Sequence, residues 1–428
     1  MIVALSLAVG LGLLPFGGGV RAMRPIEPWT GPSDMSAATP MDRPVSGSSV
    51  QAPASPQRLS PILARALQGR LDALRTSTAI PGVSVAIEFP DGSRWVGAAG
   101  EADLATKTPV RPETGFAVAS VSKTFTAALI LTLIDDGSLG LDDSVAKWLP
   151  GLELSPQITV RQLLDHPSGL RDFFMAPGID AALQGDPDRR WDAAEALARV
   201  GKPYFKPGRS WHYSNTNYLV LGLLAERVAG RPLAAQLRER FFVPLGLEHT
   251  WYQPTEKPRT SLAHAYRMPR ARPDPTAIDL SDGSAMMPFT SVVTAAAGAG
   301  GIASTAGDLV TWARALYGGE LLTPRMTSEM VADAATTAAL PPRVAYGLGV
   351  QVGELFGHRS LGHSGRLLGV RSVVRWLPDQ RLGIAVLTNQ SRTDPAAIGR
   401  AMLKVVFGPD LAAAQPTPVA TSTATPGP

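Results

Sequence analysis

The stretch FAVASVSKTFTAALILTLI, residues 116–134, is the part of the sequence that most strongly indicates the fold of this chain. A short apolar run, Phe116 to Ala119, leads into Ser120, and Thr124 to Ile134 predicts a buried helix. Ser120 and Lys123 stand three residues apart, so both side chains lie on one face at the start of that helix. A lysine with a lowered pKa can take the proton of a serine hydroxyl and make it a nucleophile. The pattern predicts a catalytic serine, whereas the alternative is a plain N-cap at Ser120.

A second copy of the pattern shows that the spacing alone is weak. Ser144 and Lys147 repeat it, but Pro150 follows closely and leaves room for barely one helical turn. We therefore expect Ser144 to be an N-cap.

Two polar triplets add to the first motif. The triplet Tyr213-Ser214-Asn215 lies in a loop before a helical pattern at 218–228, where a phenol can relay protons and an amide can bind a carbonyl. The triplet His363-Ser364-Gly365 follows a predicted short strand at 359–362, and Gly365 leaves room for a close approach of backbone or ligand. A strand edge there can pair with an extended substrate and lend an N–H group to an oxyanion hole. Taken singly, each triplet also fits a capped helix or an ordinary hairpin.

The rest of the body predicts strands at both ends and helices between them. A helix is expected over 59–75, and a hairpin over 83–89 and 94–99. Four short strands are expected at 347–352, 359–362, 370–376 and 382–388, followed by a closing helix over 395–407. This order predicts an α/β protein whose sheet is built from distant segments and interrupted by a helical region.

In their order and context, the three motifs resemble those of the serine β-lactamase and penicillin-binding-protein family. The nearest branch contains class C β-lactamases, D-Ala-D-Ala carboxypeptidases, D-aminopeptidases and related esterases. Other stretches typical of this branch are LDDSVAKWLP at 141–150, LLDHPSGL at 163–170, GGIAST at 300–305 and GHSG at 362–365. The resemblance covers residues 59–407. It implies the β-lactamase/transpeptidase-like fold, with a mainly antiparallel sheet flanked by N- and C-terminal helices and a helical insertion domain.

The resemblance also implies roles for three catalytic residues. Ser120 would attack the substrate carbonyl and become acylated. Lys123 would hold or accept the serine proton. Tyr213 would act with Lys123 as general base and would donate a proton to the leaving group.

Substrate binding is implied for five further residues. Asn215 would bind a substrate amide, and His363 with Ser364 and Gly365 would line the site opposite Tyr213. The backbone N–H groups of Ser120 and Arg366 would form the oxyanion hole. No metal or organic cofactor is implied.

The chain departs from the family pattern at the third triplet. His363 stands where true class C β-lactamases have a lysine, and a histidine is mostly neutral near pH 7. This disfavours β-lactam hydrolysis as the native role. Arg366 stands where the branch usually has a small residue, and either it supplies the missing cation or it points to solvent. Pro167 replaces the usual threonine of its loop.

Composition excludes several other classes of protein. The net charge is +4, from 40 Lys+Arg against 36 Asp+Glu, which gives no electrostatic case for nucleic acid. Since the chain has no cysteine, disulfides, thiolate metal sites and a cysteine nucleophile are excluded. A metal site would need a carboxylate-rich set, because only six histidines are present.

The ends of the chain predict export. Residues 1–22 combine an uncharged apolar run with a small-x-small pattern at Val20-Arg21-Ala22, as in a signal peptide. The alternatives are an uncleaved N-terminal anchor, which would tie the protein to the membrane, and a cytoplasmic N-terminus. Residues 23–57 read as a disordered linker rich in Pro, Ser and Gly, 58–411 as the hydrolase domain and 412–428 as a disordered tail. We therefore expect a periplasmic or extracellular protein.

The function expected is that of a serine hydrolase cleaving an amide or ester through a Ser120 acyl-enzyme. A D-Ala carboxypeptidase acting on peptidoglycan peptides and an esterase acting on small molecules both fit. The alternatives are a β-lactamase and a non-catalytic penicillin-binding sensor. The sequence leaves the oligomeric state open.

Overall fold

The computed structural model describes residues 59–268, 277–332, 335–336 and 344–408. The predicted signal or anchor segment, the linker and the C-terminal tail lie outside the described residues and stay predictions. None of the helices in the described part is both long and apolar enough to cross a membrane.

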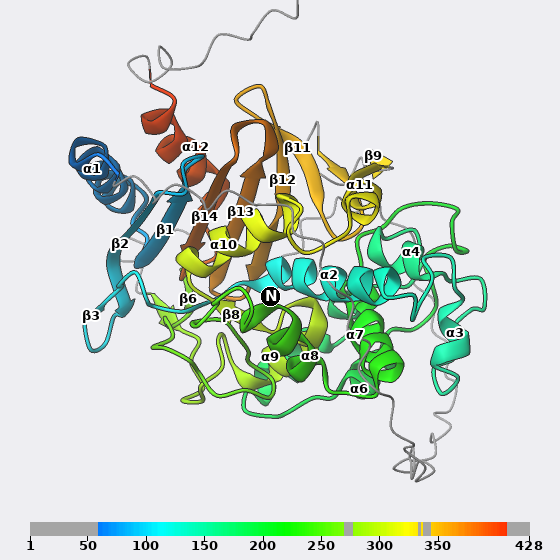
Figure 1. Cartoon of the computed structure of the whole chain (residues 1–428). Coiled ribbons are helices and arrows are strands. Elements are labelled where there is room, and N and C mark those ends of the chain that lie inside the picture. Colours follow the sequence, from blue (N-terminus) through cyan, green and yellow to red (C-terminus); the bar gives the residue numbers. More distant parts are fainter. Residues whose placement is uncertain (1–58, 269–276, 333–334, 337–343, 409–428) are drawn as a thin grey trace, which may run out of the picture.

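A nine-stranded antiparallel sheet is the centre of the molecule (Figure 1). The order of its strands is β3 (Thr108–Pro109), β2 (Arg94–Asp103), β1 (Gly82–Glu88), β14 (Leu382–Thr388), β13 (Val370–Leu377), β12 (His358–Leu367), β11 (Gln351–Leu355), β10 (Ala345–Tyr346) and β9 (Ala335–Thr336). The early strand β1 pairs with the late strand β14, Val85 standing opposite Val386. Distant segments therefore build one sheet, as the sequence predicts.

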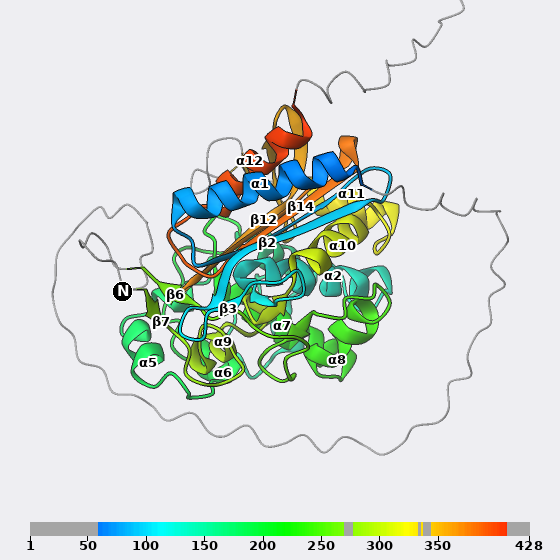
Figure 2. The same cartoon turned by 90° about the vertical axis from the view of Figure 1, so that its left-hand side faces the viewer.

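Helices cover both faces of this sheet. The helices α1 (Pro61–Thr78) and α12 (Pro395–Val406) lie on the outer face, where Leu67, Leu71 and Met402 enclose one core (Figure 2). The helices α2 (Ser122–Asp135) and α10 (Ala306–Tyr317) belong to a larger core on the inner face. Every residue of β1 and β14 is buried, because both faces of these strands are covered.

A mainly helical region interrupts the sheet in the sequence and packs below its inner face. Its helices are α3 (Val145–Trp148), α4 (Val160–Leu164), α5 (Ile179–Gly185), α6 (Ala193–Leu197), α7 (Asn215–Ala229), α8 (Leu233–Leu237) and α9 (Thr290–Ala296), and α11 (Pro324–Ala332) follows α10. Short strands accompany them: β4 (Phe116–Ala117), β5 (Trp251–Tyr252), β6 (Tyr266–Arg267), β7 (Ile278–Asp279) and β8 (Ile302–Ser304). The predicted fold class, an antiparallel sheet flanked by the terminal helices with a helical insertion, is confirmed.

Two strand predictions are wrong in their limits. The strand expected at 347–352 begins only at Gln351, because Gly349 has a φ of 77° and lies in a turn closed by the bond from Gly347 N to Val350 O. The strand expected to end at Gly362 runs on to Leu367. His363, Ser364 and Gly365 therefore lie within β12 and not after it.

Ser144 takes the N-cap position of the short helix α3, as predicted. Its hydroxyl makes no capping hydrogen bond, so only the position and not the bond is confirmed.

Candidate active site

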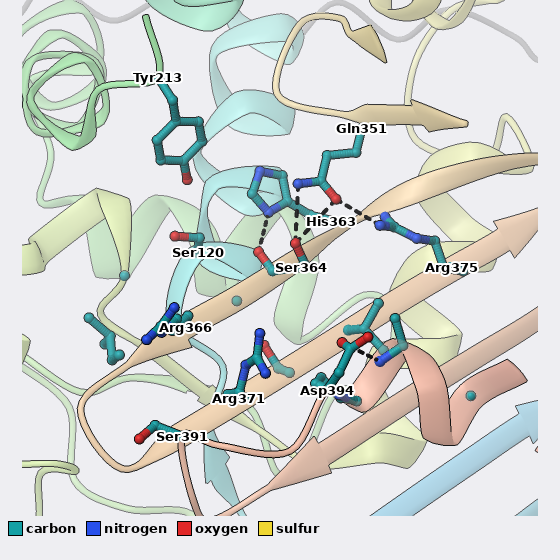
Figure 3. A pocket seen from close by; sticks show the side chains of 18 of the residues that line it. Ser120, Tyr213, Gln351, His363, Ser364, Arg366, Arg371, Arg375, Ser391 and Asp394 are labelled. Carbon is teal, nitrogen blue, oxygen red and sulfur yellow. Dashed lines mark hydrogen bonds between the residues drawn. The ribbon is translucent and has the colours of Figure 1, made fainter. Parts of the chain in front are cut away.

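Ser120 lies in a tight turn between β4 and α2. A single turn of 3₁₀ helix, Ala119–Val121, carries it, and Ala119 has a left-handed φ of 49°. The strand β8 fixes this turn from one side, since Val118 N donates to Ile302 O at 3.0 Å and Ile302 N donates to Ser122 Oγ at 3.0 Å. The hydroxyl of Ser120 is thereby held at the edge of a groove between the sheet and the helical region (Figure 3).

Lys123 is fully buried behind Ser120 and contacts three acceptors. Its Nζ lies 3.1 Å from Ser120 Oγ, 2.7 Å from Asn215 Oδ1 and 2.7 Å from Ala299 O. Burial lowers the pKa of Lys123 to about 7, and the nearby Asp172 carboxylate partly opposes this. A neutral amine can keep two of these bonds as a donor and turn its lone pair to the Ser120 hydroxyl. The geometry therefore suits Lys123 to take the serine proton.

Asn215 connects Lys123 to a buried carboxyl group. Its Nδ2 donates to Asp172 Oδ2 at 2.8 Å, while its Oδ1 accepts from Lys123. Asp172 also accepts from Phe174 N at 3.0 Å, and burial raises its pKa. Both ends of the Asn215 amide are engaged, so in this state Asn215 positions Lys123. The predicted contact of Asn215 with a substrate amide stays a prediction.

Tyr213 stands across the groove from the β12 strand, with its ring centroid 5.1 Å from Lys123 Nζ. Burial raises the pKa of Tyr213, and its interaction with Ser120 only partly offsets this. The phenol consequently keeps its proton near neutral pH. Of the two roles that the resemblance implies for Tyr213, proton donor fits this environment better than proton acceptor, and both roles stay predictions.

His363 is buried and neutral. Its Nδ1 lies 2.7 Å from Ser364 O, which can only accept, so Nδ1 carries the hydrogen. Its Nε2 lies 2.9 Å from Tyr346 Oη and therefore accepts. Burial, aided by the charge of Lys123, lowers the pKa of His363 to about 3. His363 cannot replace the cation that a lysine would supply at this position.

Gly365 allows the tight turn that carries Ser120, called the nucleophile turn below, to pack against β12. A Cβ atom at this position would stand 2.3 Å from Val118 O and 2.3 Å from Ser372 Oγ. The close approach of backbone that the sequence predicts is therefore present. The neighbouring strand β11 pairs with residues 358–362 of β12, and among the described residues no strand pairs with the half from His363 to Leu367 on that side.

The groove has a volume of about 1480 Å³ and collects the predicted residues. All of them except Lys123, which lies beneath it, line its wall: Ser120, Tyr213, Asn215, His363, Ser364, Gly365 and Arg366. Arg366 is exposed on this wall. The predicted oxyanion hole, from the N–H groups of Ser120 and Arg366, stays a prediction.

Sequence reasoning missed several residues of the groove and its surroundings. Asp172 and Tyr346 belong to none of the three motifs, and Gln351, Arg371 and Arg375 come from β11 and β13. The alternation of side chains along the late strands is the one signal that could have placed the two arginines on a common face.

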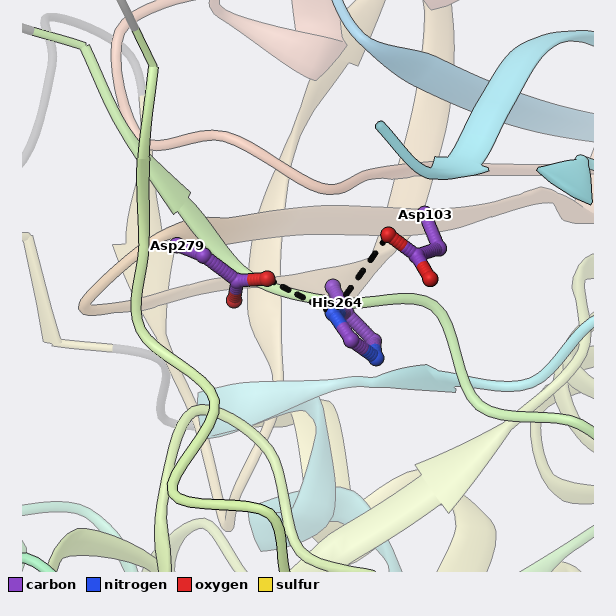
Figure 4. A group of neighbouring side chains, drawn as sticks. All are labelled: Asp103, His264 and Asp279. Atoms are coloured by element: carbon purple, nitrogen blue, oxygen red, sulfur yellow. Dashed lines mark hydrogen bonds and ion pairs between the residues drawn. The ribbon is translucent and has the colours of Figure 1, made fainter. Parts of the chain in front are cut away.

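Figure 4 shows another cluster of polar groups, Asp103, His264 and Asp279, none of which lines the groove. His264 Nδ1 stands 2.8 Å from Asp279 Oδ2 and 3.9 Å from Asp103 Oδ1. Asp103 also accepts from Ala105 N and from Thr106 Oγ1, whose bond lowers the pKa of Asp103. These contacts tie the end of β2 to β7 at the surface, and such a tie requires no metal ion.

Comparison with known proteins agrees with this geometry. The family model described as Beta-lactamase matches residues 64–407. The chain belongs to the beta-lactamase family. Its relatives include the penicillin-binding protein 4 of Amycolatopsis lactamdurans, 32% identical over 75% of this chain and 84% of the relative.

Other members of the family act on D-amino acid compounds, according to their names. The D-aminopeptidase of Cereibacter sphaeroides is 30% identical, and the match covers 78% of this chain but only 61% of that protein. Among solved structures, the D-amino acid amidase of Ochrobactrum anthropi SV3 superimposes with a TM-score of 0.71 at 27% identity, covering 81% of this chain and 98% of the amidase. The chain is thus a beta-lactamase-fold member of a serine hydrolase family.

Proposed function

We propose that this protein hydrolyses amide bonds at D-amino acid residues through an acyl-enzyme on Ser120. The observation that carries the proposal is the 3.1 Å contact between Ser120 Oγ and the buried amine of Lys123, whose pKa is about 7. Support for the D-amino acid preference comes from the names of the relatives, a D-aminopeptidase and a D-amino acid amidase.

The reaction follows from the groups around Ser120. The neutral Lys123 takes the proton of the Ser120 hydroxyl while Ser120 Oγ forms a bond to the substrate carbonyl carbon. N–H groups of the groove hold the oxyanion that results. Breakage of the carbon–nitrogen bond then leaves an ester on Ser120, and the proton that Lys123 took from Ser120 passes to the departing amine, either directly or through the phenol of Tyr213. Water attacks the ester in turn, which releases the acid and restores Ser120.

Within the class of serine hydrolases, two more specific activities remain our proposals. One is a carboxypeptidase that acts on peptidoglycan peptides, and the other is an esterase that acts on small molecules. We further propose that residues 1–22 direct export or anchor the protein at the membrane, since peptidoglycan lies outside the cytoplasm. Sequencing the N-terminus of the protein isolated from its host tests this, and an intact Met1 in a cytoplasmic fraction would contradict export.

Replacement of the nucleophile tests the proposal. We expect Ser120→Ala to abolish hydrolysis of D-alanyl-p-nitroanilide and of the L isomer alike, while the parent prefers the D isomer. Ser144→Ala is the matched control, because Ser144 has the same sequence pattern but lies outside the groove. Hydrolysis that persists in Ser120→Ala, or a parent that prefers the L isomer, would refute the proposed function.

A further inference from the structure

A loop outside the groove lining, residues 165–168 after α4, holds the segment that carries Tyr213. Three backbone carbonyls of this loop accept hydrogen bonds from residues 208–212. The three bonds are Gly208 N to Pro167 O at 2.8 Å, His212 N to His166 O at 3.4 Å and Trp211 Nε1 to Asp165 O at 2.6 Å. The loop therefore fixes the course of the chain directly before Tyr213.

The side chain of His166 continues this attachment on the other side of Tyr213. The ring is fully buried, and its Nδ1 lies 3.2 Å from Ser214 N and 3.0 Å from Asn217 Nδ2. Its centroid lies 4.4 Å from the centroid of the Tyr213 ring. His166 thus contacts both the phenol ring and the main chain that follows it.

The hydrogen bonds around His166 determine its tautomer. A backbone N–H group can only donate, so Nδ1 accepts from Ser214 N and the hydrogen is on Nε2. Asn217 agrees with this, because its Oδ1 accepts from Ser168 Oγ at 2.7 Å and its Nδ2 is left to donate to His166. The imidazole is therefore an acceptor toward the Tyr213-Ser214-Asn215 segment.

The environment of His166 does not suit it to carry protons itself. Burial, aided by the charge of Lys123, holds the pKa of His166 well below its usual range. Its Nε2 is buried and has no hydrogen-bond partner among the described residues. No printed chain of hydrogen bonds leads through the ring, so its role is to hold its neighbours in place.

The backbone of His166 is adapted to this contact. Its φ is 80°, in the left-handed region that residues with a side chain rarely adopt, although asparagine, aspartate and histidine adopt it more often than others. This conformation places the imidazole against Ser214. Contacts of the side chain compensate for the unfavourable backbone.

We propose that His166 is a positioning residue for Tyr213. Through Ser214 N and through its ring, it holds the phenol where a proton can pass to the departing amine. This deepens the proposed amide hydrolysis, on which it rests. The nitrogen of an amide must gain a proton as it leaves, whereas p-nitrophenolate leaves without one. Loss of His166 should therefore impair the cleavage of amides more than that of activated esters.

Two neutral substrates with the same acyl group test this role. They are N-acetyl-D-alanyl p-nitroanilide and N-acetyl-D-alanyl p-nitrophenyl ester, and kcat/KM reports acylation for both. We expect His166→Leu, which lacks the acceptor, to lower kcat/KM about 100-fold for the anilide and at most about threefold for the ester. His166→Asn should return the anilide value to within about tenfold of the parent, because its Oδ1 can replace Nδ1 and asparagine tolerates the left-handed φ.

A double variant shows whether His166 acts through Tyr213. Tyr213→Phe removes the phenol and should itself impair the anilide more than the ester. Addition of His166→Leu to Tyr213→Phe should then cause no further loss on the anilide. His249→Asn is the matched control, since His249 lies outside the groove and its replacement should leave both values at those of the parent.

Thermal denaturation establishes that each variant is folded, and His166→Ala replaces His166→Leu if the latter is not. An equal loss for the two substrates, additive losses in the double variant, or no recovery with asparagine would overturn the positioning role. The proposed hydrolysis is judged from the parent. A parent that cleaves neither substrate refutes the hydrolysis and this role together, whereas a parent that cleaves both while His166→Leu loses them equally refutes the role alone.

Discussion

At the scale of single residues, the environment of Lys123 determines the chemistry. The amine is surrounded by a hydroxyl, an amide oxygen and a backbone carbonyl, and the nearby carboxyl group of Asp172 reaches it through Asn215. Burial therefore outweighs attraction, and the pKa of Lys123 falls to about 7. A lysine that is partly neutral at physiological pH can act as a base without a histidine.

The first prediction concerns the pH dependence of acylation. Since the neutral amine is the active form, kcat/KM should rise with pH through a limb near 7 and then level off. A free lysine would place this limb near 10.4. Initial rates on N-acetyl-D-alanyl p-nitroanilide, which has no group that titrates between pH 5 and 10, check it. A rate that continues to climb to pH 10 would show that Lys123 is not the base.

The second prediction concerns Asp172. Its charge favours the protonated form of Lys123, so Asp172→Asn should move the limb to lower pH. The amide oxygen of the new side chain can still accept the bond from Asn215 Nδ2. The pH profile of the variant is the measurement, and Asp188→Asn, at an exposed site outside the groove, is the control. A limb that stays in place or moves upward would contradict the assignment.

The site was predictable as far as its residues fall in local motifs. Ser120 and Lys123 are brought together by one helical turn, which the sequence shows directly. Tyr346 and Asp172 reach the site only through the tertiary fold, since Tyr346 belongs to the two-residue strand β10 and Asp172 to a loop after α4. No local pattern marks such residues, because their contacts are fixed by packing between distant segments.

At the scale of elements, the fit between the nucleophile turn and β12 positions the groove. Ala119 adopts a left-handed φ of 49°, which costs a residue with a side chain about 1 kcal/mol. The bond from Ser372 Oγ to Val118 O, at 2.7 Å, and the pairing of β4 with β8 hold the turn in this conformation. The nucleophile turn and the strands that hold it therefore act as one structural unit.

The third prediction tests this unit. Gly365→Ala would place a methyl group against Val118 O, so we expect a loss of about 1–3 kcal/mol of unfolding free energy. Displacement of Ser120 should also lower kcat by about 100-fold. Chemical denaturation and steady-state kinetics measure the two effects.

The control for this prediction is Gly69→Ala, on the exposed side of α1, where a Cβ meets nothing within 4 Å. This change should raise the unfolding free energy by about 1 kcal/mol, because alanine favours the helix. If Gly365→Ala behaves like Gly69→Ala, the close packing at Gly365 is unimportant.

The strand limits show what the sequence could not fix at this scale. The length of β12 is set by its partner β13, which pairs as far as Leu367 opposite Val370. The polar triplet His363-Ser364-Gly365 has no apolar alternation to extend the strand signal. Pairing across the sheet overrides that local pattern.

At the scale of the whole molecule, the two ends of the described chain close the fold. The helices α1 and α12 pack against each other and against the outer face of the sheet (Figure 2). The part of the groove that contains Ser120 lies between the sheet and the inner helical region, and the lining also includes Pro395 and Ala396 at the start of α12. A substitution in the core beneath α1 should therefore lower the free energy of unfolding without changing the kinetic constants of the folded protein.

The fourth prediction separates these two effects. Leu71 of α1 is completely buried, so Leu71→Ala should lower the unfolding free energy by about 2–5 kcal/mol. Values of KM and kcat should match the parent at temperatures where the variant is folded. Ile62→Ala, at a site 73% exposed on the same helix, should change neither property. An equal loss in both variants would show that α1 does not seal this core.

The acyl-enzyme on Ser120 is the central claim, and its direct measurement is the mass of the intact protein. The protein would be mixed with N-acetyl-D-alanyl p-nitrophenyl ester and quenched in acid within milliseconds to seconds. We expect an added acetyl-alanyl group that maps to the peptide containing Ser120 and is missing from Ser120→Ala. Release of p-nitrophenol with no adduct at any time, or an adduct on another residue, would contradict the account.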